Sequence, residues 1–223
     1  MRNCKRLAES IEQHASTLRG MSLRILSQRD VPHMAGFTCS FIRYQATQAF
    51  RIAEWLSKEH VDDVDLIAHA TRGLFESSLT YAHLIKGGGT NFLERMMSEC
   101  AADHFDTMKA MKAICGGSTL DADFEEQLRH YEKLKTQKKI NKTPPVRILA
   151  DEVGLLGEYE TMYSYYSKYT HPTLYHLVGD HREVYSVEAC LIFGERAVQY
   201  LEMIIVDSKQ ILDIVLEQNN GKF

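Results

Sequence analysis

Residues 183–218 read EVYSVEACLIFGERAVQYLEMIIVDSKQILDIVLEQ, a stretch without proline. Apolar residues recur in alternating steps of four and three from Val187 to Val215, and the small residues Gly194 and Ser208 interrupt them. This spacing predicts one long helix with an apolar side. That side is either a wall of the chain's own bundle or an interface for a homo-oligomer formed through this C-terminal helix.

Helical stretches separated by helix-breaking residues also precede this segment. Gly87–Gly89 is expected to end one of them cleanly, since three glycines lower helix propensity by about 3 kcal/mol. Pro172 is expected to end another, because the residue before proline avoids the helical conformation. No segment reads convincingly as a strand. We therefore predict an all-α bundle of about seven helices in a single domain, 1–223. The expected helices cover about 3–27, 35–59, 62–86, 91–115, 121 fading into 138–142, 146–170 and 183–218.

Composition indicates an ordinary globular protein. Hydrophobic residues make up 44% and charged residues 25% of the chain, and the net charge of −4 argues against a general polyanion-binding surface. No run of 18 apolar residues and no apolar leader is present, so we expect no membrane partner and no signal peptide. The five cysteines are scattered and never form C-x-x-C. Reduced thiols in a cytoplasmic protein are the expected outcome.

The helix expected at 62–86 carries a polar side with a candidate site. Arg72 and Glu76 lie one turn apart on it and can pair directly. The polar side is either a solvated face or an enclosed one, since the apolar residues Phe75 and Leu79 border it. A buried ion pair is a poor device for stability, so an enclosed pair would favour a functional role.

The end of the helix expected at 146–170 is the second candidate. Residues 163–172 read YSYYSKYTHP, in which Ser167 and His171 lie one turn apart. These two side chains form either a polar helix-end junction or part of a site. The predicted core-facing side of this helix is rich in hydroxyl groups, which need partners when buried. Its members are Ile148, Leu156, Tyr159, Tyr163, Tyr166 and Thr170, with Ser167 on the flank.

The two segments together resemble a family of bacterial helical proteins of unknown function. Its signatures are R-x-x-x-E, here Arg72 to Glu76, and Y-x-x-x-S-x-x-x-H-P, here Tyr163 to Pro172. The likeness covers about 62–178 and a helical tail. It implies that Arg72, Glu76, Ser167 and His171 gather into one polar cluster, and it implies no activity. The bundle is also distantly similar to the HEPN class, which includes ribonucleases with R-x4-6-H on one helix.

Two functions follow as alternatives, and the sequence leaves open whether the protein is an enzyme. The first is a helical module that uses the polar cluster to bind a protein partner or a small ligand. The second is metal-independent RNA cleavage. In that case His171 is the general acid or base, Arg72 binds the phosphate, Glu76 positions Arg72, and Ser167 and Tyr163 orient substrate or histidine. The chain lacks R-x4-6-H, so Arg72 and His171 would have to meet across two helices.

Two further patterns have weaker implications. His171, His176 and His181 recur every five residues and would converge on a metal only in a loop, with Asp180 or Glu183 joining them. No standard motif for a phosphate, a dinucleotide or zinc occurs, so we predict no cofactor and no resident metal. A basic stretch could hold an RNA backbone or be a solvated helix end. It consists of Arg129, Lys133, Lys135, Lys138, Lys139 and Lys142.

Overall fold

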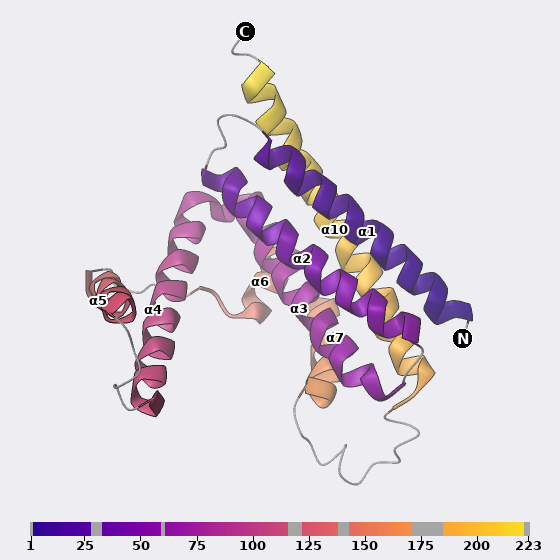
Figure 1. The fold of residues 1–223 in the computed structure, drawn as a ribbon. Helices are drawn as coiled ribbons and strands as arrows, with labels where there is room; N and C mark the ends of the chain where they lie inside the picture. The colour runs from indigo at the N-terminus through magenta and orange to yellow at the C-terminus, as the bar shows by residue number, and fades with distance from the viewer. Residues whose placement is uncertain are drawn as a thin grey trace. The chain divides into compact units, whose positions relative to one another are not determined.

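The computed structural model describes residues 2–27, 33–58, 61–115, 122–137, 143–170 and 185–220. All regular structure in these ranges is helical, which confirms the predicted all-α class (Figure 1). The α-helices are α1 (Arg2–Leu26), α2 (His33–Lys58), α3 (Val64–His83), α4 (Gly89–Cys115), α5 (Ala122–Gln137), α6 (Val146–Glu152), α7 (Leu156–Thr170) and α10 (Val187–Asn220). A 3-10 turn, η1 (Val61–Asp63), precedes α3, and a π-helix, η2 (Leu84–Gly88), follows it.

The chain divides into two compact units, Met1–Ile85 with Val146–Phe223, and Lys86–Pro145. The second unit contains the paired helices α4 and α5. Lys112 and Glu125 form an ion pair between them at 2.6 Å, and the rings of His104 and Tyr131 lie 5.1 Å apart. That all of 1–223 forms a single domain stays a prediction.

The first unit is a bundle of α1, α2, α3 and α10, with α6 and α7 packed on α3. In Figure 1 the long helices α1, α2 and α10 run side by side. Its core consists mainly of aliphatic and small residues on α1, α2, α3 and α10, and α3, α7 and α10 add large aromatic residues. Since α3 contacts α2, α7 and α10, it is buried on most of its circumference. This central position is what makes its polar residues notable.

The apolar side of α10 faces the chain's own bundle, as the first of the two interpretations predicts. Leu201, Ser208 and Leu212 are buried, and α10 packs on α1, α2 and α3. Gly194 allows an especially close approach, because a Cβ atom there would lie 3.1 Å from a methyl group of Leu56. Homo-oligomer formation through this helix stays a prediction.

The single helix expected over 146–170 is wrong, because the chain breaks between α6 and α7. Gly154 has φ +80°, and the Leu155 N–H donates to the Ala150 carbonyl at 2.7 Å. The Gly154 N–H donates to the Asp151 carbonyl at 3.0 Å. These two bonds form the Schellman arrangement that ends helices at a left-handed residue, usually glycine.

This break also corrects the predicted core-facing side of the segment. Since α6 and α7 are separate helices, one continuous stripe does not describe both. Ile148 is 46% exposed, and the buried residues of α7 are Met162, Tyr166 and Tyr169. Of the predicted face, Tyr166 alone is fully buried on α7.

The clean helix end expected at Gly87–Gly89 is also wrong. Helical hydrogen bonding continues through the π-helix η2, and α4 begins at Gly89, whose φ is +48°. Glycine lowers helix propensity without forbidding helical backbone, and it adopts positive φ without a steric penalty. The chain therefore passes from α-helix to π-helix at Leu84 and returns to α-helix at Gly89.

Two buried tyrosines share a hydroxyl network at the contact of α7 and α10. Their hydroxyl groups, on Tyr166 and Tyr200, lie 2.9 Å apart, and the Tyr200 hydroxyl donates to Glu158 Oε1 at 2.6 Å. Arg196 Nη1 reaches the other carboxylate oxygen at 3.3 Å. Burial raises the pKa of both tyrosines well above the ordinary value. The hydroxyl-rich segment predicted from the sequence thus meets partners within the core.

Most of the cysteines whose side chains are described lie in the core. Cys4, Cys39 and Cys190 are buried and Cys100 is exposed, and no disulfide joins these four. Burial raises the pKa of Cys190 to about 11. Within the ranges described, we find no helix with the length and apolar character needed to cross a membrane.

Candidate functional site

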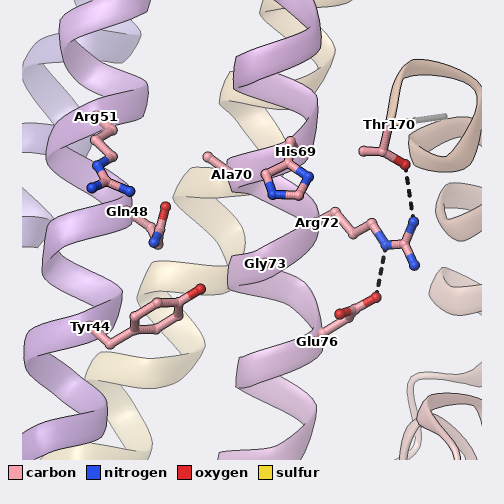
Figure 2. Close-up of a pocket in the computed structure, with 9 residues that line it drawn as sticks. All are labelled: Tyr44, Gln48, Arg51, His69, Ala70, Arg72, Gly73, Glu76 and Thr170. Carbon is pink, nitrogen blue, oxygen red and sulfur yellow. Dashed lines mark hydrogen bonds and ion pairs between the residues drawn. The ribbon is translucent and has the colours of Figure 1, made fainter. Parts of the chain in front are cut away.

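Arg72 is the centre of a polar cluster between α3 and α7. Its Nε donates to Glu76 Oε1 at 2.8 Å, its Nη1 to Thr170 Oγ1 at 3.1 Å, and its Nη2 to the Tyr163 hydroxyl at 2.6 Å. The Cζ atom also lies 4.5 Å from the centre of the Tyr163 ring, within range of a cation–π interaction. Figure 2 shows the bonds to Glu76 and Thr170. Three fixed contacts hold the guanidinium in one orientation.

Helix geometry explains why these residues meet. Arg72 and Glu76 are one turn apart on α3, and Tyr163 and Thr170 are two turns apart on one side of α7. Because α7 packs on α3, the two pairs face each other. The side chains of Arg72 and Glu76 are 19% and 34% exposed, so the polar side of α3 is neither fully solvated nor fully enclosed.

Electrostatics keep Arg72 a cation. Burial alone would lower the pKa of Arg72. The hydrogen bond and charge of Glu76 outweigh burial, with a further contribution from Tyr163, so the pKa is raised. The pKa of the Tyr163 hydroxyl is also raised, first by burial and then by the charge of Glu76, against the effect of Arg72. The cluster therefore holds a permanent guanidinium cation, paired with the Glu76 carboxylate, beside a phenol whose ionisation is disfavoured.

Ser167, another predicted member of the cluster, makes no contact with Arg72. The Ser167 hydroxyl donates to the Tyr163 carbonyl oxygen one turn earlier on α7, at 2.9 Å. His171 lies outside the described residues. Thr170, which the sequence placed on the core-facing side without a role, supplies the third contact to Arg72. The structure thus brings together Arg72, Glu76 and Tyr163, and their functional roles stay predictions.

A groove of about 390 Å³ opens next to this cluster, over α3 and toward α2 (Figure 2). Its size falls in the lower part of the range for small-molecule sites, about 300–1,000 Å³. Ala70 and Gly73 carry little or no side chain and leave its floor open. The lining residues are Tyr44, Gln48, Arg51, His69, Ala70, Arg72, Gly73, Glu76 and Thr170.

The α2 wall of the groove was not anticipated from the sequence. Tyr44, Gln48 and Arg51 recur at steps of four and three, so they project from one side of α2. The side chains of Gln48, Arg51 and His69 have no hydrogen bond or ion pair with the described residues. Other polar residues such as Arg43, Thr47 and Glu54 also lie on α2, so this stripe did not stand out, and nothing in the sequence says that α2 and α3 are neighbours.

The predicted metal ligands and several lysines of the predicted basic stretch are not among the described residues. His171, His176 and His181, with Asp180 and Glu183, lie outside the described residues, and so do Lys138, Lys139 and Lys142. Arg129 and Lys133 are exposed on α5. Elsewhere in the described chain, no three His, Cys, Asp or Glu side chains gather as metal ligands would.

Comparison with known proteins confirms the predicted membership of a family of unknown function. No curated protein and no solved structure matches the chain. A family model does match, over residues 45–184, a range that contains Arg72, Glu76, Tyr163 and Thr170 and all of the groove lining except Tyr44. On this match the chain belongs to DUF5677, a family of unknown function.

Proposed function

We propose that the protein is a helical ligand-binding module whose groove binds a small anionic ligand. One observation carries the proposal: Arg51 and Arg72 line the same groove, and Glu76 is the one acidic residue among its lining. Glu76 already accepts a hydrogen bond from Arg72. An anion is therefore the ligand whose charge the groove complements.

The donors available in the groove support this proposal. An arginine has five N–H groups. Arg72 uses three of them, for Glu76, Thr170 and Tyr163, so two remain without a partner among the described residues. The whole guanidinium of Arg51 is also unpaired there. Guanidinium groups bind phosphate and carboxylate through paired, charge-assisted hydrogen bonds.

The contacts of Arg72 also prepare it for binding. Ordering a long side chain on binding costs about 0.5–1.5 kcal/mol. Tyr163, Thr170 and Glu76 already hold the guanidinium in place, so much of that ordering precedes ligand binding. Arg51, which is exposed, would close on the ligand from the opposite wall.

Calorimetric titration with inorganic phosphate, ribose 5-phosphate and citrate tests the proposal. Losing one charge-assisted contact is worth about 1.5–3 kcal/mol, so Arg51→Gln and Arg72→Gln should each weaken binding about 10- to 150-fold. Arg72→Lys keeps the charge but not the fork, and should bind more weakly than the wild type. Arg43→Gln, on an exposed part of α2 outside the groove, is the matched control. The proposal is rejected if the wild type binds none of the three anions. It is also rejected if Arg43→Gln weakens anion binding as much as Arg51→Gln and Arg72→Gln do.

RNA cleavage is the second candidate, and one contact favours it. Arg72 hydrogen-bonds Thr170, the residue directly before His171 in the sequence. In this alternative Arg72 binds the scissile phosphate, Glu76 positions it, His171 acts as acid or base, and Ser167 and Tyr163 orient the reacting groups. Incubation of labelled RNA with wild type and His171→Ala decides it. Equal cleavage by both proteins, or cleavage by neither, rejects catalysis at His171.

A further inference from the structure

Tyr44 provides a flat aromatic surface at one end of the groove. The residue is 49% exposed although it lines the groove. Its hydroxyl lies 3.7 Å from where a Cβ atom of Gly73 would be, so the ring reaches from α2 across to α3. Figure 2 shows the ring directed toward Gly73. The tip of the ring thus lies beside the α3 backbone at Gly73, while much of the residue stays exposed.

Different chemical groups follow Tyr44 along α2. Gln48, one turn further, is partly buried and offers an amide donor and an amide acceptor. Arg51, two turns from Tyr44, lies about 10 Å further along the helix axis, at a rise of about 1.5 Å per residue. The wall thus changes from an aromatic ring through an amide to a cation, and Arg72 lines the same groove from α3.

We propose that the anionic ligand of the groove is a nucleoside monophosphate. Its base stacks on Tyr44, the base edge meets the Gln48 amide, and its phosphate lies between Arg51 and Arg72. Aromatic side chains bind bases by stacking, and amides read their donor and acceptor edges. A simple phosphate or carboxylate would leave Tyr44 and Gln48 without a role. This inference rests on the proposed function and adds the class of ligand.

Titration with AMP, adenosine, ribose 5-phosphate and inorganic phosphate tests it by separating base from phosphate. Stacking of one base is worth about a 5- to 150-fold gain in affinity, so AMP should bind that much more tightly than ribose 5-phosphate. Adenosine should bind more weakly than AMP, because it lacks the group that Arg51 and Arg72 recognise. CMP, GMP and UMP extend the panel to the other bases.

Two variants locate the stacking surface. Tyr44→Ala should reduce AMP affinity to that of ribose 5-phosphate and leave ribose 5-phosphate binding unchanged. Tyr44→Phe keeps the ring and should keep AMP affinity, which excludes a role for the hydroxyl alone. Fluorescence of Trp55, the single tryptophan, reports whether each variant is folded.

The outcomes distinguish this inference from the proposed function. If ribose 5-phosphate binds as tightly as AMP, or if Tyr44→Ala leaves AMP binding unchanged, the nucleotide inference is wrong and anion binding stands. If adenosine binds as tightly as AMP, the phosphate has no role and both ideas fail. If none of the compounds binds the wild type, both fail as well.

Discussion

Removal of the Tyr200 hydroxyl should destabilise the bundle more than its size suggests. Tyr200 is 2% exposed and Tyr166 fully buried, and the Tyr200 hydroxyl joins Tyr166 to Glu158. Tyr200→Phe loses a hydrogen bond to a carboxylate, worth about 1.5–3 kcal/mol, and leaves the Tyr166 hydroxyl buried without this partner, at about 1–3 kcal/mol. We expect a loss of about 3 kcal/mol in the free energy of unfolding.

Tyr166→Phe should be milder, at about 1 kcal/mol, because Tyr200 keeps its bond to Glu158. The double variant, Tyr166→Phe with Tyr200→Phe, also removes the Tyr166 hydroxyl that Tyr200→Phe leaves without its partner. Its loss should therefore be smaller than the sum of the two single losses by about 1–2 kcal/mol. Urea unfolding followed by the fluorescence of Trp55, which lies in the same unit, measures all four proteins.

Equal slopes of the unfolding free energy against urea are needed for this comparison, since they indicate the same exposed surface in each variant. Additive losses, within about 0.5 kcal/mol, would mean that the two hydroxyl groups do not depend on each other. That result would refute the network, because it would mean that Tyr200→Phe does not leave the Tyr166 hydroxyl without a needed partner.

Three other variants follow from buried or constrained positions. Gln45 is fully buried and neither amide atom has a partner in the described chain, so Gln45→Met should raise the free energy of unfolding by about 1 kcal/mol, whereas Gln48→Met on the groove should change it little. Burial raises the pKa of Tyr81 to about 12, so the folded protein keeps the tyrosine neutral at a pH where the unfolded chain ionises it. The contribution of Tyr81 to stability is therefore complete below pH 10 and falls by about 3 kcal/mol between pH 10 and 12. The difference in unfolding free energy between wild type and Tyr81→Phe, measured in urea, should shrink over that range. Gly154 has φ +80°, so Gly154→Ala should lower the thermal midpoint through a cost of about 1–2 kcal/mol, and Gly157→Ala, which has open space inside α7, should not lower it.

The positions of helices and the direction of their apolar faces could be predicted where they depend on residues close in sequence. The spacing along α10 is a local pattern, and it describes a buried side of the structure. The break at Gly154 was equally local but was missed, because apolar residues continue on both sides of it. The helix end predicted at Gly87–Gly89 was wrong, because glycine lowers helix stability by a small amount that contacts with the surrounding structure can outweigh.

The candidate site could be predicted only in part, because it is made by neighbours distant in sequence. Arg72 and Glu76 are visible as a pair on one helix, and the tyrosine-rich approach to His171 identified Tyr163. Thr170 became relevant only when α7 was seen to face α3. The α2 wall depends on the packing of α2 against α3, a contact that no spacing within either helix encodes.

The ion pair between Arg72 and Glu76 contributes little stability by itself. An ion pair as exposed as Arg72 and Glu76, at 19% and 34%, contributes about 0–1 kcal/mol, and more deeply buried pairs are often replaced by apolar residues without loss. Its neighbours on the helix, Phe75 and Leu79, are fully buried, so apolar residues are readily accommodated there. What the contacts with Glu76, Tyr163 and Thr170 do achieve is a fixed guanidinium at the edge of an open groove. The bonds to Tyr163 and Thr170 join α7 to α3, and the fixed orientation also favours binding in the proposed function, because the ligand then meets a donor that is already in place. The contacts of Arg72 therefore serve the packing of two helices and prepare the guanidinium that the proposed anion would meet.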